Sequence, residues 1–350
     1  MKTFDVAIIG AGPAGAVAAR HLAQSGHEVL LIDDAPHTLK IGESLPGSAY
    51  PLLCELGLLP WLQASEPMPC LGNIVAWGEA PVYYRDFMRE PHGAGWHLER
   101  QSFDALLRKA ACEAGVIWFK QRLQQVKRMG SHWWLALSDE SVCARWLIDA
   151  SGRRSILARR LGVRRERDQP LIALYARSHS TGVDQRTCIE AVANGWWYSA
   201  PLPHQQRIAA LHVTPAQAQK VLKDTSGWFS QLDQTHHIQA HSCATQWAQP
   251  QACEASGSYL QHFAGEQWLA VGDAALAYDP LSSQGIFNAL YTAMRGAQAV
   301  QAAFAGKRDA IEQYTGKLLS VRQAYVRNLD FYYRNERRWA DQEFWRARQQ

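Results

Sequence analysis

The stretch that decides the fold is FDVAIIGAGPAGAVAARHLAQSGHEVLLIDD, residues 4–34. The apolar run that ends at Ile9 predicts a β-strand, and the alanine-rich stretch to about Gln24 predicts an α-helix. A second apolar run predicts a strand that closes at Asp33. Between the first strand and the helix stands G-A-G-P-A-G, a glycine turn of the kind that opens a βαβ unit. The stretch therefore predicts a dinucleotide-binding start to the chain.

Each glycine of the turn has its own physical task. Gly10 lets the chain turn tightly, Gly12 lets the backbone approach a pyrophosphate, and Gly15 lets the helix pack close to the strand. The helix N-terminus then faces the phosphate charge, and an acid at the end of the second strand receives ribose hydroxyls. Spacing alone does not separate NAD from FAD. The residues predicted to bind the cofactor here are Gly10, Gly12, Pro13, Ala14, Gly15, Asp33 and Asp34.

Length and composition bound the remaining possibilities. The chain has 350 residues, enough for two domains or for one large α/β domain with a second sheet inserted. Its 36 basic and 32 acidic side chains are interspersed, and a net charge of +4 does not predict a nucleic-acid or membrane surface. Seven cysteines without a C-x-x-C pair favour a reduced cytoplasmic protein. No apolar run approaches the roughly eighteen residues of a membrane span, so we expect a soluble protein.

No metal site is predicted. The histidine-containing stretch HHIQAHSC, residues 236–243, is interpreted as a strand-like run with scattered histidines.

A second segment resembles a known family. WLAVGDAALAYDPLSSQGIFNAL, residues 268–290, looks like the second flavin-binding segment of the para-hydroxybenzoate-hydroxylase-like flavoproteins. The resemblance implies FAD as the cofactor, and it implies that the stretch from Asp279 opens a helix whose free N–H groups face the flavin. The residues that it assigns to cofactor binding are Gly272, Asp273, Pro280, Ser282, Ser283, Gln284, Gly285 and Ile286.

Two further pieces are similar to the same family and imply the architecture. They are LIDASGRRS, residues 147–155, and HLERQSFDALL, which begins at His97 and places Arg100 near the flavin or its phosphates. The implied fold is α/β, with a FAD-binding Rossmann-like domain of the glutathione-reductase type, an inserted antiparallel-sheet substrate domain and C-terminal helices. The predicted ranges are 1–70, 98–165 and 260–305 for the discontinuous FAD-binding domain, 71–97 and 166–259 for the substrate domain, and 306–350 for a C-terminal helical tail.

The stretch NGWWYSAPLP, residues 194–203, half-matches a signature of the flavin-dependent tryptophan halogenases, which this chain resembles. That family's W-x-W-x-I-P keeps here only its first tryptophan and its proline. Halogenation also needs a lysine in the tunnel and a glutamate beside the substrate. No lysine occurs from Ile41 to Arg108, Lys40 precedes the G-E segment, and Ser282 stands where the glutamate should be. The resemblance therefore implies the halogenase fold without its catalytic groups.

A narrower resemblance is carried by loops and by the end of the chain. GESLPGSAYPLLCELGLL, AWGEAPVYYRDF and YYRNERRWADQEFW look like the flavoprotein maturases of the amino-acid oxidases that carry cysteine tryptophylquinone. The resemblance implies an FAD monooxygenase, reduced by NAD(P)H, that hydroxylates a tryptophan side chain in a precursor protein, which would be its partner. The aromatic and arginine-rich end is expected to pack as a helix, with a docking surface as the alternative.

The predicted catalytic residues follow from this assignment. Glu43 and Ser44, with Gly42, lie on the loop after the second strand and are the polar candidates for the edge of the flavin. His97 is the candidate for proton handling. Trp196, Trp197 and Tyr198 are expected to form a stacking wall that excludes water, or else to pack the core of a sheet.

Other functions stay open at this point. They are a halogenase that recruits another lysine, a flavin-dependent reductase of isoprenoid double bonds, and a flavin-bearing escort protein that does not oxidise its partner. A free indole or phenol could also replace the precursor protein as the substrate.

Overall fold

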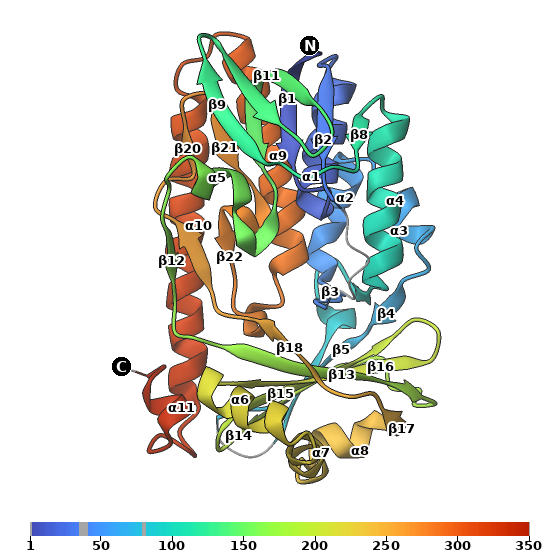
Figure 1. Ribbon diagram of the computed structural model, residues 1–350. Helices are drawn as coiled ribbons and strands as arrows, with labels where there is room; N and C mark the ends of the chain where they lie inside the picture. Colours follow the sequence, from blue (N-terminus) through green and yellow to red (C-terminus); the bar gives the residue numbers. More distant parts are fainter. Residues whose placement is uncertain (1, 35–40, 79–81, 350) are drawn as a thin grey trace.

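The computed structural model describes residues 2–34, 41–78 and 82–349, so Lys40 and residues 79–81 of the quoted loop lie outside the described part. Figure 1 shows two large sheets at opposite ends of the molecule, with the long helix α10 (Ala310–Asn335) running along one side from the first sheet to the second.

The first sheet is the one that the opening stretch predicts. β1 pairs in parallel with β2 on one side and with β11 on the other. The strands are, in spatial order, β20 (Ala264–Gly265), β21 (Trp268–Ala270), β11 (Ser141–Asp149), β1 (Thr3–Ile9), β2 (Val29–Ile32) and β8 (Ile117–Phe119), with the hairpin of β9 (Gln125–Met129) and β10 (His132–Ala136) joined to β11.

Three helices cover this sheet and build the main core. α1 (Pro13–Gln24) packs against α4 (Arg100–Glu113) and α9 (Gly285–Phe304). Because helices and the hairpin cover the strands, β2 is buried along its whole length, and its apolar residues run without alternation. The expected strand to Ile9, helix to Gln24 and following strand are all present in the structure.

The second sheet is antiparallel except where β14 pairs in parallel with β5. One face packs on three short helices through a core that contains Trp197 and Trp228. The strands are, in spatial order, β17 (Ala244–Trp247), β13 (Ile172–Ser180), β16 (Gln206–Val213), β15 (Gly195–Leu202), β14 (Thr187–Val192), β5 (Gly72–Ala76) and β6 (Tyr83–Asp86), with β18 (Gln251–Glu254) also paired to β13.

The remaining elements are short. Two three-stranded sheets are made of β3 (Ser44–Leu45), β7 (Gly95–His97) and β4 (Met68–Cys70), and of β12 (Arg165–Arg167), β19 (Ser258–Leu260) and β22 (Leu276–Ala277). The short helices are α2 (Tyr50–Glu55), α3 (Leu59–Gln63), α5 (Ile156–Arg160), α6 (Pro215–Lys223), α7 (Ser226–Asp233), α8 (His237–Ser242) and α11 (Glu343–Arg346).

The two large sheets draw on separate parts of the chain. The strands of the first lie within residues 3–32, 117–149 and 264–270, and those of the second lie within residues 72–86 and 172–254. The exact domain boundaries stay a prediction.

The histidine-containing stretch is a helix, and the predicted strand-like run is wrong there. The carboxylate of Glu190, on β14, accepts hydrogen bonds from the backbone N–H groups of His236, His237 and Ile238, at 2.9–3.0 Å. A carboxylate at this position satisfies free N–H groups and the positive end of the helix dipole, which favours α8 over a strand.

Three aromatic residues near the end of the chain pack inward, whereas Phe331 and Tyr332 are exposed. Tyr333, Phe344 and Trp345 are buried, and the Trp345 indole N–H donates to the carbonyl of Val192 at 2.9 Å. The chain end is therefore fixed to the second sheet.

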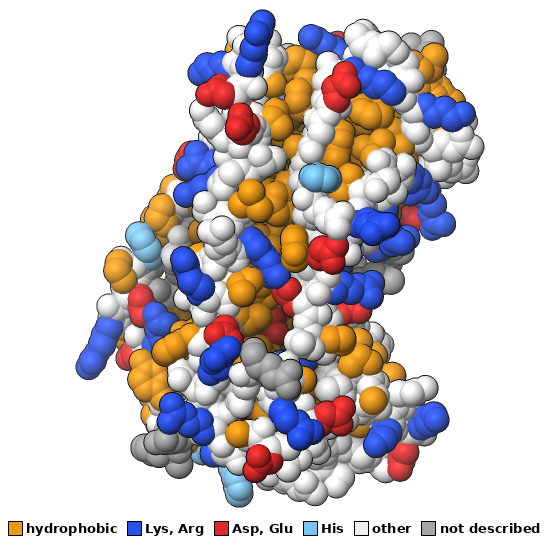
Figure 2. Space-filling view, turned by 90° about the vertical axis from the view of Figure 1, so that its left-hand side faces the viewer, with side chains coloured by type: hydrophobic (Ala, Val, Ile, Leu, Met, Phe, Trp, Pro, Cys, Tyr) orange, Lys and Arg blue, Asp and Glu red, His pale blue; other side chains and the backbone are white. Residues whose placement is uncertain are grey.

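No helix in the described ranges has the length and apolar character needed to cross a bilayer. On the face seen in Figure 2, Lys and Arg side chains are spread from end to end among acidic and apolar ones, and they do not form one continuous patch.

Candidate functional site

A cavity of about 820 Å³ lies between the two sheets. Its upper wall comes from the glycine turn and the N-terminal ends of two helices, and its lower wall comes from β15, β16 and β18 of the second sheet. Of the predicted site residues, those that line it are Gly10, Gly12, Pro13, Ala14, Asp33, Asp34, Gly42, Glu43, Ser44, Arg100, Tyr198, Asp273, Pro280, Ser282, Ser283, Gln284, Gly285 and Ile286.

The three glycines of the turn differ in what surrounds them. Gly10 has a φ of +105°, and a Cβ there would lie 2.3 Å from the carbonyl oxygen of Ala150. A Cβ on Gly15 would lie 1.8 Å from the carbonyl oxygen of Gly10. A Cβ on Gly12 would meet nothing within 4 Å. Gly10 and Gly15 are thus required by packing, whereas Gly12 leaves open room at the cavity wall where a ligand can approach the backbone.

Two helices present their N-terminal ends to the cavity. α1 begins beside Gly12 and α9 begins beside Gln284, and neither has an acidic residue in its first turn or a side chain that caps it. Free N–H groups and an uncompensated dipole make such ends favourable for anions. The site is therefore suited to a ligand with negative charge at two separate places.

The end of the cavity beside β2 carries the two acids. The Asp33 carboxylate accepts a hydrogen bond from the backbone N–H of Ala11, which joins the strand end to the glycine turn. Asp34 forms an ion pair with Arg122 at 2.7 Å. Trp118 and Lys120 also line this end. The N–H of Asp33 donates to the carbonyl of Phe119, which lies between them in the sequence.

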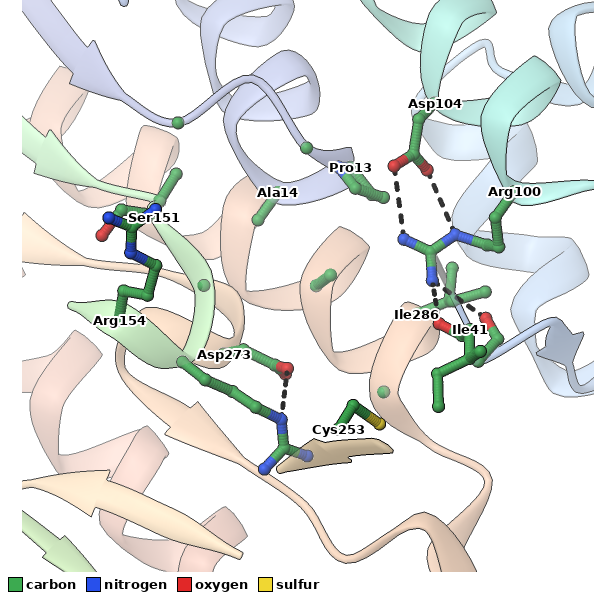
Figure 3. A pocket seen from close by; sticks show the side chains of 18 of the residues that line it. Pro13, Ala14, Ile41, Arg100, Asp104, Ser151, Arg154, Cys253, Asp273 and Ile286 are labelled. Atoms are coloured by element: carbon green, nitrogen blue, oxygen red, sulfur yellow. Dashed lines mark hydrogen bonds and ion pairs between the residues drawn. The ribbon is translucent and has the colours of Figure 1, made fainter. Parts of the chain in front are cut away.

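Arg100 holds the loop at Gly42 in place. Figure 3 shows its guanidinium between Asp104 on one side and the backbone near Ile41 on the other. It donates to the Ile41 and Gly42 carbonyls at 3.0 and 2.9 Å and to the Asp104 carboxylate at 3.2 Å. Burial lowers the pKa of Arg100, but Asp104 and Glu43 more than offset this, so the pKa is raised and the guanidinium stays charged. Its contacts show how the loop that carries Glu43 is positioned.

Glu43 is a buried carboxylate on the cavity wall, with only 1% of its surface exposed. Its Oε2 accepts from the N–H of Gly42 at 3.0 Å, and its Oε1 lies 3.6 Å from the Arg177 guanidinium but has no hydrogen-bond donor. Burial raises the pKa of Glu43, and the neighbouring arginines only partly oppose this. A buried carboxylate oxygen without a donor is costly, so a ligand that reaches it with a hydrogen-bond donor is favoured.

Ser44 and Tyr198 are joined across the cavity wall by a hydrogen bond of 2.9 Å between their hydroxyls. Burial raises the pKa of Tyr198, so the phenol stays protonated. Because Tyr198 comes from β15 and Ser44 from β3, this bond fixes the loop with Glu43 to the second sheet.

Asp273 lies 3.5 Å from the Arg153 guanidinium, and Figure 3 marks a contact at the Asp273 carboxylate with a dashed line. Arg153 also donates to the carbonyls of Ser256 and of Tyr278, the latter at 2.7 Å. Arg153 and Arg154, together with Cys253 and His212, line the cavity without having been predicted. The two arginines directly follow the quoted L-I-D-A-S-G stretch. Their position just after a strand end that packs beside the cofactor could have identified them as cavity residues.

The structure does not bring three of the predicted catalytic residues to the cavity. His97 is fully buried, its Nε2 lies 3.3 Å from the carbonyl of Gln185, and burial lowers its pKa to about 4. Trp197 points to the other face of β15 and packs on Trp228. Trp196 shares a face with Tyr198, but it is buried behind His212, with their rings stacked at 3.6 Å. Side chains alternate along a strand, so neighbours cannot all form one wall.

Two predicted cofactor residues also lie behind the cavity lining. Gly15 serves the close helix packing described above. Gly272, at φ +58°, donates its N–H to Thr292 at 2.7 Å, and a Cβ there would lie 2.8 Å from that of Ala14. Both glycines therefore shape the wall from behind.

A family profile described as "FAD binding domain" matches residues 3–329. The chain belongs to this FAD-binding family. The match covers the glycine turn, both helix ends and the second sheet, so the α/β fold and the FAD cofactor predicted from the sequence are confirmed, and the protein is an FAD-dependent oxidoreductase.

Individual relatives cover the whole chain. LodB of Marinomonas mediterranea, named as an FAD-dependent oxidoreductase, is 29% identical over 99% of this chain and 97% of its own. The myxobacterial chondrochloren halogenase CndH has a TM-score of 0.91 at 23% identity and covers all of this chain and 86% of its own. The peptidyl tryptophan dihydroxylase QhpG, described as essential for tryptophylquinone cofactor biogenesis, has a TM-score of 0.79 at 24% identity, over 99% of this chain and 79% of its own.

The residues of the cavity fit FAD. Gly12 leaves room for a pyrophosphate beside the end of α1, Asp33 stands at the strand end where a ribose is expected, and the end of α9 faces the middle of the cavity. These features match the negative charges and hydroxyls of the cofactor.

Proposed function

We propose that the protein is an FAD-dependent monooxygenase that hydroxylates a tryptophan side chain in a precursor protein, as a step in the formation of a quinone cofactor. The reaction would consume one dioxygen and one NAD(P)H per hydroxyl inserted, with the second oxygen atom leaving as water. The observation that carries the proposal is the part of the cavity wall formed by the second sheet, which is largely apolar and has no lysine among its described residues, together with Ser282 where the halogenases have a glutamate.

Two positions bear on halogenation. The halogenase resemblance puts Ser282 where that family has its glutamate, and Ser282 lines the cavity. Of the lysines in the described ranges, only Lys120 lines the cavity, and it lies at the end with Asp34, away from the second sheet. The second sheet contributes Tyr198, Ile208, Ala210, His212, Cys253 and Glu254 to the wall, and most of these are apolar or aromatic. Such a wall favours binding of an indole ring over binding of a halide.

The relatives support the same choice. LodB matches this chain from end to end, and QhpG, a protein of the same fold, is named for the dihydroxylation of peptidyl tryptophan. An activity on protein-bound tryptophan therefore agrees both with the residues of the cavity and with these two relatives.

The chain would contribute binding and electrostatics. Bound FAD, once reduced by NAD(P)H, supplies the electrons that activate dioxygen. Gly12 and the end of α1 would hold the pyrophosphate, and the N–H groups at the start of α9 would stabilise negative charge on the ring system. The Ser44–Tyr198 pair closes the wall and keeps water away from the reacting atoms.

Glu43 would accept a hydrogen bond within the cavity. Glu43 belongs to the cavity wall, and its buried Oε1 lacks a hydrogen-bond donor. The indole N–H of a tryptophan is a donor without acceptor capacity, so it matches this oxygen. In this proposal Glu43 orients the ring, and Arg177 keeps the carboxylate in place.

The test is a competition between substrates. The purified flavoprotein is given NADPH, oxygen and bromide, together with free tryptophan and a tryptophan-bearing precursor of a cysteine tryptophylquinone oxidase, and both are weighed by mass spectrometry. We expect a gain of oxygen mass, roughly 16 Da per hydroxyl, confined to the precursor. Oxygen gain on free tryptophan alone would overturn the proposal that the substrate is a protein.

Two other outcomes would overturn the monooxygenase proposal itself. Bromine on either substrate would show that a halogenating group exists despite Ser282. Maturation of the precursor in cells by a variant that binds no flavin, such as Gly12→Trp, would show that the protein acts as an escort.

A further inference from the structure

The turn that leads into α9 is held by the C-terminal helix. Asp279 begins this turn, and Pro280, Ser282 and Ser283 within it line the cavity beside the first residues of α9. Ser283 has a φ of +50°, a left-handed conformation that is rare for a residue with a side chain and needs support from its surroundings.

The support comes from two tyrosines of α10. The Tyr333 hydroxyl donates to Oδ2 of Asp279 at 2.9 Å, while Oδ1 accepts from the N–H of Leu281 at 2.9 Å. The N–H of Asp279 donates to the Tyr325 hydroxyl at 2.8 Å. The turn is thus fixed at both its backbone and its side chain by residues that follow it by 46 and 54 positions.

The same tyrosine contacts the second sheet. The indole N–H of Trp196 donates to the Tyr333 hydroxyl at 3.1 Å, and the Trp196 ring stacks on His212, which lines the cavity. Tyr333 therefore joins the turn beside the cofactor to the opposite wall of the cavity.

Tyr333 and Asp279 are both deeply buried, so losing the hydrogen bond between them would be costly. Tyr333 is 2% exposed and Asp279 is 5% exposed. If the hydroxyl were removed, Oδ2 of Asp279 would be a buried carboxylate oxygen without its donor, and the turn would have to shift to find water or another donor.

We propose that Tyr333 is a positioning residue for the flavin, which acts through Asp279 to set the turn that precedes α9. This inference rests on the FAD binding that the family establishes, and it does not depend on the tryptophan hydroxylation proposed above. Its failure and the failure of the proposed function can therefore be told apart.

The test compares two substitutions on one helix. Tyr333→Phe removes the hydroxyl that holds Asp279. The matched control, Tyr314→Phe, removes an equally buried hydroxyl of α10 that donates to the carbonyl of Ala270 at 2.7 Å, where neither residue lines the cavity. The readouts are the FAD dissociation constant, from flavin fluorescence on serial dilution of the holoenzyme, and the visible spectrum of the bound flavin.

We expect the dissociation constant of Tyr333→Phe to rise roughly tenfold, with a shifted flavin spectrum, while Tyr314→Phe keeps the parent values. Equal FAD affinity and equal spectra for Tyr333→Phe and the parent would overturn the inference, whatever the thermal midpoints.

A double substitution tests the route through Asp279. Asp279→Asn keeps an acceptor for the Leu281 N–H but changes the group that meets Tyr333. If Tyr333 acts through Asp279, the double variant binds FAD about as weakly as the weaker single variant. If the two effects multiply, the residues act independently and the positioning role is overturned. This measurement also serves if Tyr333→Phe alone is poorly folded, because Asp279→Asn is then compared with Tyr314→Phe.

Discussion

At the scale of single residues, the glycines of the turn separate folding from cofactor binding. Gly12→Ala adds a methyl group where nothing lies within 4 Å, at a φ of −74° that alanine accepts. We expect the unfolding free energy of the flavin-free protein to change by less than about 0.5 kcal/mol. FAD affinity should fall at least roughly tenfold, because the methyl group fills the room of the pyrophosphate. Denaturant unfolding and flavin titration measure the two effects.

The contrasting variant is Gly15→Ala. Its methyl group would lie 1.8 Å from the carbonyl oxygen of Gly10, so α1 would have to move away from β1. We expect a loss of about 3 kcal/mol or more in the flavin-free protein. If Gly12→Ala and Gly15→Ala lowered the unfolding free energy equally, the distinction between a ligand-facing and a packing glycine would be wrong.

We expect His97 to make the stability of the protein depend on pH. Burial lowers its pKa from the ordinary 6.5 to about 4, so the unfolded chain takes up the proton first as the pH falls. The contribution of His97 is therefore complete above pH 6.5 and is lost as the pH falls to about 4, a change of roughly 3 kcal/mol. His97→Gln should lose less stability over this range, as measured by denaturant unfolding at several pH values.

The control for this prediction is His92→Gln, at an exposed position. It should leave the pH dependence of unfolding as it is in the parent. If His97→Gln and the parent lose stability with the same slope between pH 6.5 and 4, the buried neutral histidine is not the cause.

At the scale of elements, the start of α9 should set the reduction potential of the flavin. Gln284 lines the cavity at the N-cap of a helix whose first turn carries no acid. Gln284→Glu adds a negative charge there, which opposes negative charge on the reduced ring. We expect the midpoint potential to fall by roughly 30 mV, while the helix itself gains a few tenths of a kcal/mol. Potentiometric titration of the holoenzyme measures the shift.

Gln301→Glu adds the same charge near the other end of α9, on an exposed residue outside the cavity lining. The potential should stay at the parent value, and the helix should lose a few tenths of a kcal/mol because an acid opposes its C-terminal dipole. A similar fall in potential for both variants would show that net charge, and not the helix end, governs the flavin.

Some of these helices and strands could be predicted from the sequence and others could not. β1, α1 and β2 were predictable because apolar period and glycine spacing are local signals. The helix α8 was not, since its cap, Glu190, lies 46 residues away on another strand. Along β15, side chains alternate between the two faces, so Trp197 and Tyr198 point to opposite sides. The prediction of one aromatic wall did not take this alternation into account.

The features of the site that the sequence does not predict are contacts between segments far apart in the chain. The sequence gives no local sign that Tyr333 reaches Asp279, or that Arg100 binds the backbone at Ile41, 59 residues earlier. The residues of the cavity were largely predictable because two motifs supply them, whereas the pairs that hold those motifs in place depend on tertiary packing.

At the scale of the whole molecule, the chain end connects the two sheets. α10 packs against α9 of the first sheet, and Trp345 beyond it is buried against Trp77 and bonded to Val192 of the second sheet. Trp345→Ala would remove a large buried side chain and a hydrogen bond together. We expect it to cost about 3–5 kcal/mol of unfolding free energy.

The consequence should reach the cofactor as well. If the anchor at Trp345 is lost, the end of α10 that carries Tyr333 loses part of its packing, because the two rings lie 6.1 Å apart. We expect weaker FAD binding in addition to the lower stability, measured by thermal unfolding and by flavin release in the same sample. Phe331→Ala, on the same helix but 60% exposed, should change the unfolding free energy by less than about 0.5 kcal/mol and retain the flavin. A Trp345→Ala protein that unfolds at lower temperature yet holds FAD as tightly as the parent would mean that the chain end stabilises the second sheet alone.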